Sequence, residues 1–413
     1  MRLPSLILIA AIALTGCLKD SITHRYTFYR PLYRTTAEVR ANIKSNPVQP
    51  IHVPGKLFYK DGFVYLNELD KGVHIIDISI PAAPRKVAFV DIPGCVDIAV
   101  RGNILYADLY IDLVALDISN PAQVKVAKII DGVFPHRYYG GFTADTSKVI
   151  IDWERVDTIV KDSDGNGAWG LKAEDMRVFA ATTNSGGGQV TNGIGGSMAR
   201  FALASDRLYT VSYNDLKAFN VNNPADPFFV SQTNIASWRL ETIFPFKSNL
   251  FIGASDGMYI CDISEKDKPR QVGKFTHARV CDPVVANDNY AYVTLRDGTK
   301  CQGFINQLDV VDIKNLFAPS LVKSYPLTNP HGLAIDGNLL LICDGRDGLR
   351  VMDATHPNNV TQLGWLKGLE TYDVIALGGT ALAVATDGLY LVDYNNPAVP
   401  AVLSKISIAN SGM

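Results

Sequence analysis

Residues Leu113–Val124 read LVALDISNPAQV: a short apolar run, an aspartate, and a Ser-Asn-Pro break. Alone, this stretch predicts one β-strand that ends at a turn, because Asn and Pro favour turns and interrupt strands. Nearly the same stretch recurs along the chain. The recurrence, more than any single copy, decides the fold.

Seven copies of the stretch occur, and each ends its apolar run with a marker residue. The markers are Asp77, Asp117, Asn220, Asp262, Asp312, Asp353 and Asp393. Consecutive markers are separated by 40, 103, 42, 50, 41 and 40 residues. A regular spacing of this kind indicates a repeat architecture, in which every repeat is one supersecondary unit.

Each repeat contains four predicted strands. The strand before the marker strand opens with turn residues, as in DGFVYLNE (61–68) and GNILYADL (102–109). A strand of small apolar residues precedes it, such as 96–100, and a fourth strand, such as 124–130, follows the proline turn. The Asp-Gly and Gly-Asn pairs between the first two strands fit tight hairpins. The sequence therefore predicts four-stranded antiparallel units with little helix.

Both faces of these strands are apolar. Alternate residues from Leu113 to Ile118 point to opposite sides of the sheet, and both sets are hydrophobic except for the marker. A single sheet leaves two such faces in water, whereas sheets stacked around an axis bury both, as in a β-propeller. A linear β-solenoid is the alternative, although its turns are usually shorter. We expect an all-β propeller over residues 54–408.

One spacing, 103 residues, is too long for a single unit. Within it, residues 141–157 resemble the first two strands of another unit, but no marker strand follows. Residues 158–197 contain polar, glycine-rich stretches that are typical of a surface insertion. A regular unit resumes at Met198. We therefore predict seven blades, with eight as the alternative.

The recurring pattern resembles the LVIVD repeat: paired apolar residues, Asp, Ile or Tyr, Ser or Asn, and Pro. The resemblance extends from Pro54 to Ile408, and only residues 134–197 depart from it. Over this stretch the chain is similar to LVIVD-repeat lipoproteins of Bacteroidetes. The resemblance implies a β-propeller on the cell envelope and implies no particular reaction.

The N-terminus resembles a bacterial lipoprotein signal peptide. A positively charged start precedes the apolar segment 3–13, and small residues then precede Cys17. We expect residues 1–16 to be removed and an acylated Cys17 to anchor the domain in a membrane; an ordinary signal peptide is the alternative. Lys19 and Asp20 resemble the export signal of Bacteroidetes lipoproteins, which implies an outer-membrane protein that faces the cell surface.

Residues 17–53 are interpreted as a lipidated tether. Thr36 is expected to cap a short helix that extends to Lys44 and ends before Pro47. No run of about 18 apolar residues occurs, so no transmembrane helix is predicted in the mature chain.

Charge and cysteine content limit the classes of ligand. The chain has 39 Lys and Arg residues against 41 Asp and Glu residues, so it lacks the basic surplus of nucleic-acid binders. Five of the six cysteines follow Cys17, so their pairing cannot be complete. Cys261 and Cys343 lie in apolar strands and are expected to be buried thiols, whereas Cys281 and Cys301 are a candidate disulfide.

One mouth of the propeller channel is the candidate site, because the first strand of every unit lines the channel. Aligned units place Asp97, Glu241, Asp282, His331 and Asp373 at the start of this strand, with Tyr139 in the incomplete unit. The candidate ligand-binding residues are Arg137, Tyr138, Trp238, Arg239, Glu241, Arg279, Asp282, His331, Tyr372 and Asp373. Such polar groups with aromatic walls suit a small ligand or a peptide end.

A structural role is the alternative for the aligned acids, which can accept backbone N–H bonds in turns, as we expect of the markers. Arg137, Arg239 and His331 break the repeat and are the stronger site candidates.

Residues 162–167, DSDGNG, match the start of a calcium loop, in which Asp162, Asp164 and Asn166 supply oxygen ligands. The position that requires an acid holds Ala173, with Glu174 one place out of register. A solvated loop is the alternative, and no other metal or cofactor is predicted, because no zinc-ligand spacing occurs.

No nucleophile elbow, phosphate-binding loop or zinc-protease motif occurs. The leading hypothesis is a lipid-anchored envelope scaffold that binds a protein or glycan partner, because rigid blades with variable loops present broad docking faces. The alternative is an enzyme, a hydrolase or lyase, with its site at the channel mouth, since propellers host many functions. A purely structural role in the envelope is the third hypothesis.

Overall fold

The computed structural model describes residues 23–135, 138–139, 142–143, 147–161, 194–237, 239–276, 283–296 and 305–409. The chain divides into two compact units. By residue number, the larger unit comprises 33–139, 143–151 and 180–413, and it contains the repeats. The smaller unit includes most of β1 (Thr23–Thr35) and β13 (Lys148–Lys161), which pair as a two-stranded sheet.

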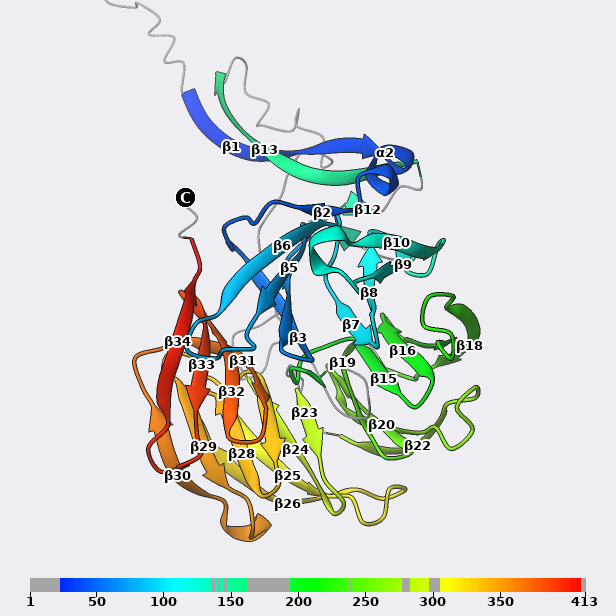
Figure 1. The fold of residues 1–413 in the computed structure, drawn as a ribbon. Coiled ribbons are helices and arrows are strands. Elements are labelled where there is room, and N and C mark those ends of the chain that lie inside the picture. The colour runs from blue at the N-terminus through cyan, green and yellow to red at the C-terminus, as the bar shows by residue number, and fades with distance from the viewer. Residues whose placement is uncertain are drawn as a thin grey trace, which may run out of the picture. The chain divides into compact units, whose positions relative to one another are not determined.

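Seven four-stranded antiparallel blades make up most of the larger unit (Figure 1). Blade 1 contains β3 (Pro54–Lys60), β4 (Phe63–Glu68), β5 (Gly72–Asp77) and β6 (Arg85–Asp91). Blade 2 contains β7 (Ile98–Arg101), β8 (Ile104–Leu109), β9 (Asp112–Asp117) and β10 (Lys125–Ile130). Blade 3 contains β15 (Phe201–Ala204), β16 (Arg207–Ser212), β17 (Asp215–Asn220) and β18 (Phe228–Asn234).

The other four blades repeat this pattern. Blade 4 contains β19 (Leu240–Phe246), β20 (Asn249–Ala254), β21 (Gly257–Asp262) and β22 (Arg270–Phe275). Blade 5 contains β23 (Val284–Ala286), β24 (Tyr290–Leu295), β25 (Gln307–Asp312) and β26 (Ser320–Pro326). Blade 6 contains β27 (Leu333–Asp336), β28 (Leu339–Cys343), β29 (Leu349–Asp353) and β30 (Thr361–Leu366). Blade 7 contains β31 (Thr371–Ala376), β32 (Thr380–Ala385), β33 (Gly388–Asp393) and β34 (Ala401–Ser407).

Contacts between strands place the first strand of every blade innermost. Each innermost strand contacts the innermost strand of the next blade, and β31 of blade 7 contacts β3 of blade 1. The blades therefore close into a ring, which confirms the predicted all-β propeller and excludes an open solenoid. The face on which the innermost strands begin is termed the N-face, and the face on which they end is the C-face.

The alternative of eight blades is wrong. Strand β7 of blade 2 contacts β15 of blade 3 directly, which leaves no place for another blade. The hairpin expected over 141–157 instead supplies β12 (Phe142–Thr143), which pairs with β11 (Tyr138–Tyr139), and β13, which pairs with β1. Because this stretch has no marker strand, it cannot complete a four-stranded sheet of its own.

Apolar side chains between neighbouring blades form the core. In β9, the consecutive residues Leu113 to Leu116 are each 0 % exposed, so both faces of the strand are buried. Burying one such large side chain stabilises the fold by about 1.5–3 kcal/mol. The two apolar faces predicted from the opening stretch therefore pack against two different neighbours.

The seven markers form the turns that follow the third strands. Each marker side chain accepts a hydrogen bond from the backbone N–H two residues later, at 2.8–3.0 Å. At Asp77, hydrogen bonds from the hydroxyl and the N–H of Ser79 lower the pKa of the carboxyl group to about 2. The markers thus have the structural role of turn residues that satisfy backbone donors.

A short helix, α2 (Thr36–Ala41), precedes the first blade, but its cap differs from the prediction. Thr35, not Thr36, is the N-cap: its hydroxyl accepts the N–H of Glu38 at 3.2 Å, and the Glu38 carboxylate accepts the N–H of Thr35 at 2.8 Å. This reciprocal capping box fixes the helix start one residue earlier. The helix ends at Ala41 and does not reach Lys44.

Residues 42–53, termed the strap, continue from α2 along the propeller. Within the strap, β2 (Ser45–Asn46) pairs with the outer edge of β6. Ile51 is 0 % exposed, forms a β-bridge with Ile408, and belongs to the apolar cluster that joins blades 1 and 7. The strap therefore seals the seam between the first and last blades.

Two further expectations concern cysteines and membrane helices. Cys261 and Cys343 are buried free thiols, as predicted, while Cys281 and Cys301 lie outside the described residues. Within the described part of the chain, no helix has both the length and the apolar composition needed to span a membrane.

Ile51→Ala is expected to destabilise the protein by about 2–5 kcal/mol, because it leaves a cavity in the seam between blades 1 and 7. Chemical denaturation measures the free energy of unfolding. Ile80→Ala is the matched control, since Ile80 is 64 % exposed and its loss should change stability by about 0.5 kcal/mol or less. Equal losses in the two variants would contradict the role of the strap.

Candidate functional site

Four charged residues occupy equivalent positions at the N-face, where the innermost strands begin. Counted back along each ladder from the hairpin between the first two strands, Lys56, Asp97, Arg200 and Asp373 share one register position. They belong to blades 1, 2, 3 and 7, which are consecutive in the closed ring. Around this arc the charges alternate in sign: Asp97 and Asp373 attract the Lys56 ammonium, and Arg200 repels it.

The structure corrects the expected alignment of Glu241 and His331 by one residue. A β-bulge in β19 places Thr242, not Glu241, at the position equivalent to Asp97. In blade 6, the N–H of Cys343 donates to the carbonyl of Gly332, which therefore takes that position in place of His331. Bulges add a residue to one strand, and a spacing read from sequence does not reveal them.

Lys56 and Arg200 occupy positions equivalent to Asp97 that the sequence analysis did not include. The repeats were aligned on an acidic residue at the start of the first strand, so repeats with a lysine or arginine at that position were left out. Counting from the markers gives the signal: Arg200 precedes its marker by 20 residues, as Asp97 and Asp373 precede theirs. Lys56 precedes its marker by 21 residues.

The Lys56 ammonium is enclosed at the centre of the N-face. The Lys56 side chain is 4 % exposed, and its Nζ lies 4.0 Å from Oδ2 of Asp97, which is 0 % exposed. Nζ also donates a hydrogen bond to the carbonyl of Met198 at 2.9 Å. The same Oδ2 of Asp97 accepts the backbone N–H of Arg200 at 2.6 Å, and its Oδ1 accepts the N–H of Ile98 at 3.0 Å.

Burial dominates the protonation of this cluster. Desolvation lowers the pKa of the Lys56 amine to about 7, while the nearby Asp97 carboxylate acts in the opposite direction. Desolvation likewise raises the pKa of Asp97, which Lys56 partly offsets. A buried ion pair of this kind is costly to break, because removal of one partner leaves an uncompensated charge.

Glu241 and His331 are also buried on the N-face, each beside an arginine. Burial raises the pKa of Glu241, although Arg239 approaches it with its Nε 3.5 Å from Oε1. Arg296 contacts Nε2 of His331 at 3.1 Å. Burial, and secondarily Arg296, lower the pKa of His331 to about 3, so the imidazole is neutral near neutral pH. A neutral, enclosed imidazole of such low basicity is poorly matched to general-base catalysis.

The structure brings only part of the predicted mouth together. Glu241, His331 and Asp373 are 3 %, 4 % and 2 % exposed, whereas the Arg239 side chain is 42 % exposed and Tyr372 is partly exposed beside the His331 ring. The backbone of Tyr138 lies in β11, and its side chain is outside the described residues. Also outside them are Arg137, Trp238, Arg279, Asp282, Cys17, Asp162, Asp164 and Asn166. Among the described residues, no group of His, Cys, Asp and Glu is arranged to hold a metal ion.

A segment of the chain itself fills the channel. Strand β14 (Ile194–Gly195) pairs with the inner edge of β3 in blade 1. Beyond it, the Ser197 hydroxyl accepts the N–H of Leu333 in blade 6, and the carbonyl of Ala199 accepts the N–H of Ile243 in blade 4. Residues 194–200, termed the plug, thus contact blades on several sides of the axis.

The plug departs from the surface insertion expected over 158–197. Gly195, Gly196 and Ser197 are buried. A Cβ on Gly196 would lie 2.0 Å from Oδ2 of Asp373, so only glycine permits this approach to the carboxylate. The glycines suggested a loose surface loop, but here they allow close packing inside the ring.

Among the described residues, the C-face end of the channel forms a pocket of about 530 Å³, termed the vestibule. Its walls are the ends of four innermost strands, around residues 244–246, 285–287, 333–337 and 374–378. Ile194, Gly195 and Ser197 of the plug also line it. Most lining side chains are apolar, including the partly exposed Phe246 and Ile335. The vestibule is therefore a largely apolar recess beside the plug.

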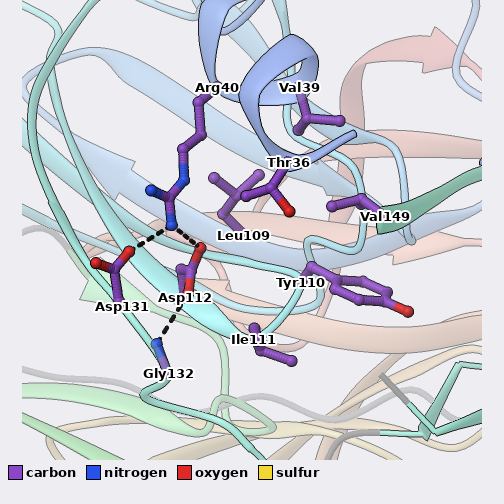
Figure 2. Close-up of a pocket in the computed structure, with 10 residues that line it drawn as sticks. All are labelled: Thr36, Val39, Arg40, Leu109, Tyr110, Ile111, Asp112, Asp131, Gly132 and Val149. Carbon is purple, nitrogen blue, oxygen red and sulfur yellow. Dashed lines mark hydrogen bonds and ion pairs between the residues drawn. The ribbon is translucent and has the colours of Figure 1, made fainter. Parts of the chain in front are cut away.

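A second pocket, of about 400 Å³, lies between α2 and blade 2 (Figure 2). Arg40 reaches from α2 to two carboxylates, with its Nη2 2.6 Å from Oδ2 of Asp112 and in contact with Asp131. The N–H of Gly132 donates to Oδ1 of Asp112 at 2.9 Å. These bonds raise the pKa of Arg40, chiefly through Asp112, and they fasten the helix to the blade.

Three stretches of the chain match a known repeat. Residues 57–91, 95–131 and 279–326 match the model of the LVIVD repeat, and these stretches correspond to blades 1, 2 and 5. The LVIVD repeats expected from the sequence are therefore present. No curated protein matches the chain.

Solved structures with similar folds are distant in sequence. The Pan2 WD40 domain of Neurospora crassa is 8 % identical, with a TM-score of 0.54 over 93 % of this chain and 98 % of that one. The computationally designed protein Ika8 is 10 % identical, with a TM-score of 0.53 over 88 % and 93 %. A chain of the mitotic checkpoint complex is 8 % identical, with a TM-score of 0.51 over 83 % and 87 %. These likenesses show the fold alone.

Lys56→Met is expected to destabilise the protein by about 3–5 kcal/mol at pH 6, where the Lys56 amine is still charged, because Asp97 loses the buried cation beside it. It should also change the pH dependence. Between the folded-state pKa of Lys56, about 7, and the unfolded value of about 10.4, the unfolded state binds the extra proton, so this group makes stability rise with pH. Lys56→Met should flatten that rise when urea denaturation is compared at pH 7 and pH 9.

Lys125→Met is the control, because Lys125 is exposed on the outer strand β10. Its effect should be about 0.5 kcal/mol or less, with an unaltered pH profile. A Lys56→Met variant that matches this control in both stability and pH profile would refute a buried ammonium at the centre of the ring.

Proposed function

We propose that this protein is a lipid-anchored binding scaffold of the cell envelope, and that its vestibule holds part of a protein or glycan partner. The vestibule carries the proposal: it is open, largely apolar, about 530 Å³ in volume, and framed by innermost strands. Ligand sites are typically concave, mostly apolar pockets of about 300–1,000 Å³. LVIVD repeats folded as a propeller fit a binding role, because the closed ring of blades holds the connecting loops on a rigid scaffold.

The geometry of the N-face gives less support to the alternative of a hydrolase or lyase. Glu241 and His331 are enclosed, and each is beside an arginine rather than at an open surface. We assign these groups, with Lys56 and Asp97, to holding the plug and the innermost strands in place. Arg239 and Tyr372 are the described residues of the predicted mouth that remain accessible, and we keep them as candidate ligand contacts.

The envelope location rests on the N-terminal sequence. We propose that acylated Cys17 anchors the chain in the outer membrane and that the propeller faces the cell surface. An acyl chain contributes about 0.8 kcal/mol per buried methylene, so a doubly acylated residue retains a folded domain at a bilayer.

The partner class follows from fold and charge. Propellers generally mediate protein interactions, and this chain shares its fold with a WD40 domain and with a chain of a checkpoint complex. A formal net charge of −2 at pH 7 gives no preference for polyanions. A protein or a glycan is therefore the partner that we propose.

Chemical cross-linking in intact cells, followed by purification and mass spectrometry, tests the scaffold. The wild-type chain should capture a defined envelope partner, and Ile335→Arg should reduce capture about tenfold or more, because it places a charge in the apolar vestibule. Ile80→Arg makes the same change at a C-face position outside the vestibule and should leave capture unaltered. Thermal denaturation of both variants checks that they fold.

The anchor is tested separately. Cys17→Ser should move the protein from the membrane fraction to the soluble fraction. Capture that is equal in the two arginine variants, or absent in all chains, would contradict the scaffold. Retention of the Cys17→Ser variant in membranes would contradict the lipid anchor.

A further inference from the structure

The innermost strands around the vestibule have one edge that no described strand covers. Strands β19, β23, β27 and β31 each stand at the end of the strand order of their sheet. An edge strand presents unpaired backbone N–H and C=O groups, which can pair with another extended chain. Toward the C-face these edges border the vestibule. The N–H groups of Ile243 in β19 and Leu333 in β27 are already bonded to the plug, so β23 and β31 offer the edges for backbone pairing beside the apolar walls.

Blade 1 shows that the interior of the ring accepts an added strand. There β14 pairs antiparallel with the inner edge of β3, through Ile194 opposite Tyr59 and Gly195 opposite Phe58. Ile194 and Gly195 also form part of the vestibule wall. An extended chain that occupied the vestibule would therefore lie beside a strand of the same kind, and it would use the same mode of recognition.

The plug limits which part of a chain can occupy this position. Ser197 lines the vestibule and also binds the backbone of Leu333, so the plug stands across the channel behind the recess. A polypeptide cannot pass through the ring at this point. The recess therefore suits a chain end, or a tight bend, more than a continuous strand.

The charge of the lining favours one kind of chain end. Among the residues that line the vestibule, Asp336 is the one with an ionisable side chain. Its Oδ2 accepts a hydrogen bond from the Tyr394 hydroxyl at 2.7 Å. In a mostly apolar recess, a carboxylate attracts an ammonium group and repels a second carboxylate. An amino terminus is therefore the complementary chain end.

We infer that the vestibule binds the amino terminus of an extended polypeptide with apolar first residues. Its backbone pairs with an inner edge such as that of β31, its ammonium group faces Asp336, and its first side chains contact Phe246, Ile335 and Leu377. This inference rests on the proposed function and specifies the partner of the same site.

Fluorescence anisotropy with synthetic heptapeptides tests the inference. The probes are a labelled pool with a free amino terminus and Ile, Val, Leu or Phe at the first two positions, an N-acetylated pool, and a pool N-methylated at the second peptide nitrogen. The free pool should bind saturably to the full-length protein. Acetylation should weaken binding about fivefold, through loss of one charge interaction, and N-methylation about tenfold, through loss of one hydrogen bond.

Variants locate the binding in the vestibule. Ile335→Arg should abolish binding of the free pool, whereas Ile80→Arg should not alter it. Asp336→Asn keeps an acceptor for Tyr394 but removes the charge, so it should weaken the free pool about fivefold and leave the acetylated pool unaltered. Thermal denaturation should show that all three variants fold.

Several outcomes would overturn the inference: no saturable binding, equal binding of free and acetylated pools, insensitivity to N-methylation, or equal effects of the two arginine variants. Its failure is distinguishable from failure of the scaffold. If cells yield a partner whose capture depends on Ile335 while the peptides do not bind, the scaffold stands and the vestibule takes another group. If no partner is captured, the scaffold itself fails.

Discussion

Apolar contact between neighbouring blades is the constraint on which the rest of the structure depends. Every repeat makes a sheet with two hydrophobic faces, and neither face is stable in water. The burial of Leu113 to Leu116 on both sides of β9 shows that two neighbours are needed for each blade. Only a closed ring gives each of seven blades two neighbours, and Ile51 of the strap completes the seam where the first blade meets the last.

Closure has a consequence at the axis, where seven innermost strands begin side by side. Polar side chains that meet at the axis need hydrogen-bond or ion-pair partners, because burying an unpaired charge costs free energy. Alternating charges meet that need on one arc, from Asp373 through Lys56 and Asp97 to Arg200, and the plug supplies backbone carbonyls and a hydroxyl to several blades. In the part of the chain that the structure describes, the N-face is consequently polar around the axis, while the C-face carries an apolar recess.

The fold could be predicted from sequence because each repeat carries its own local signal. Three local features indicate the same four-stranded unit: the Asp117 turn, the apolar residues before it and the hairpin glycines. Because they recur in seven repeats, their agreement is not due to chance. The interior of the ring could not be predicted in the same way. Gly195 and Gly196 lie in a glycine-rich stretch of the kind that predicts a loop, and only the tertiary contact with Asp373 shows that a side chain at residue 196 would clash.

The site was only partly predictable for a related reason. Asp97 and Asp373 stood out as repeated acids, but Lys56 faces them from an equivalent position with the opposite charge. A β-bulge moved Glu241 out of the aligned position. Single-residue bulges, and opposite charges that face each other from different blades, depend on how the strands pack in three dimensions. The spacing of residues along the sequence does not reveal them.

The arrangement at the axis depends most directly on the plug lying inside a closed ring. Hydrogen exchange followed by mass spectrometry can compare the amides of residues 194–200 with those of the exposed hairpin turn at residues 102–103. We expect the plug to exchange as slowly as the innermost strands, because its backbone groups are buried and bonded to several blades. Exchange of the plug as fast as that of the exposed turn would contradict it.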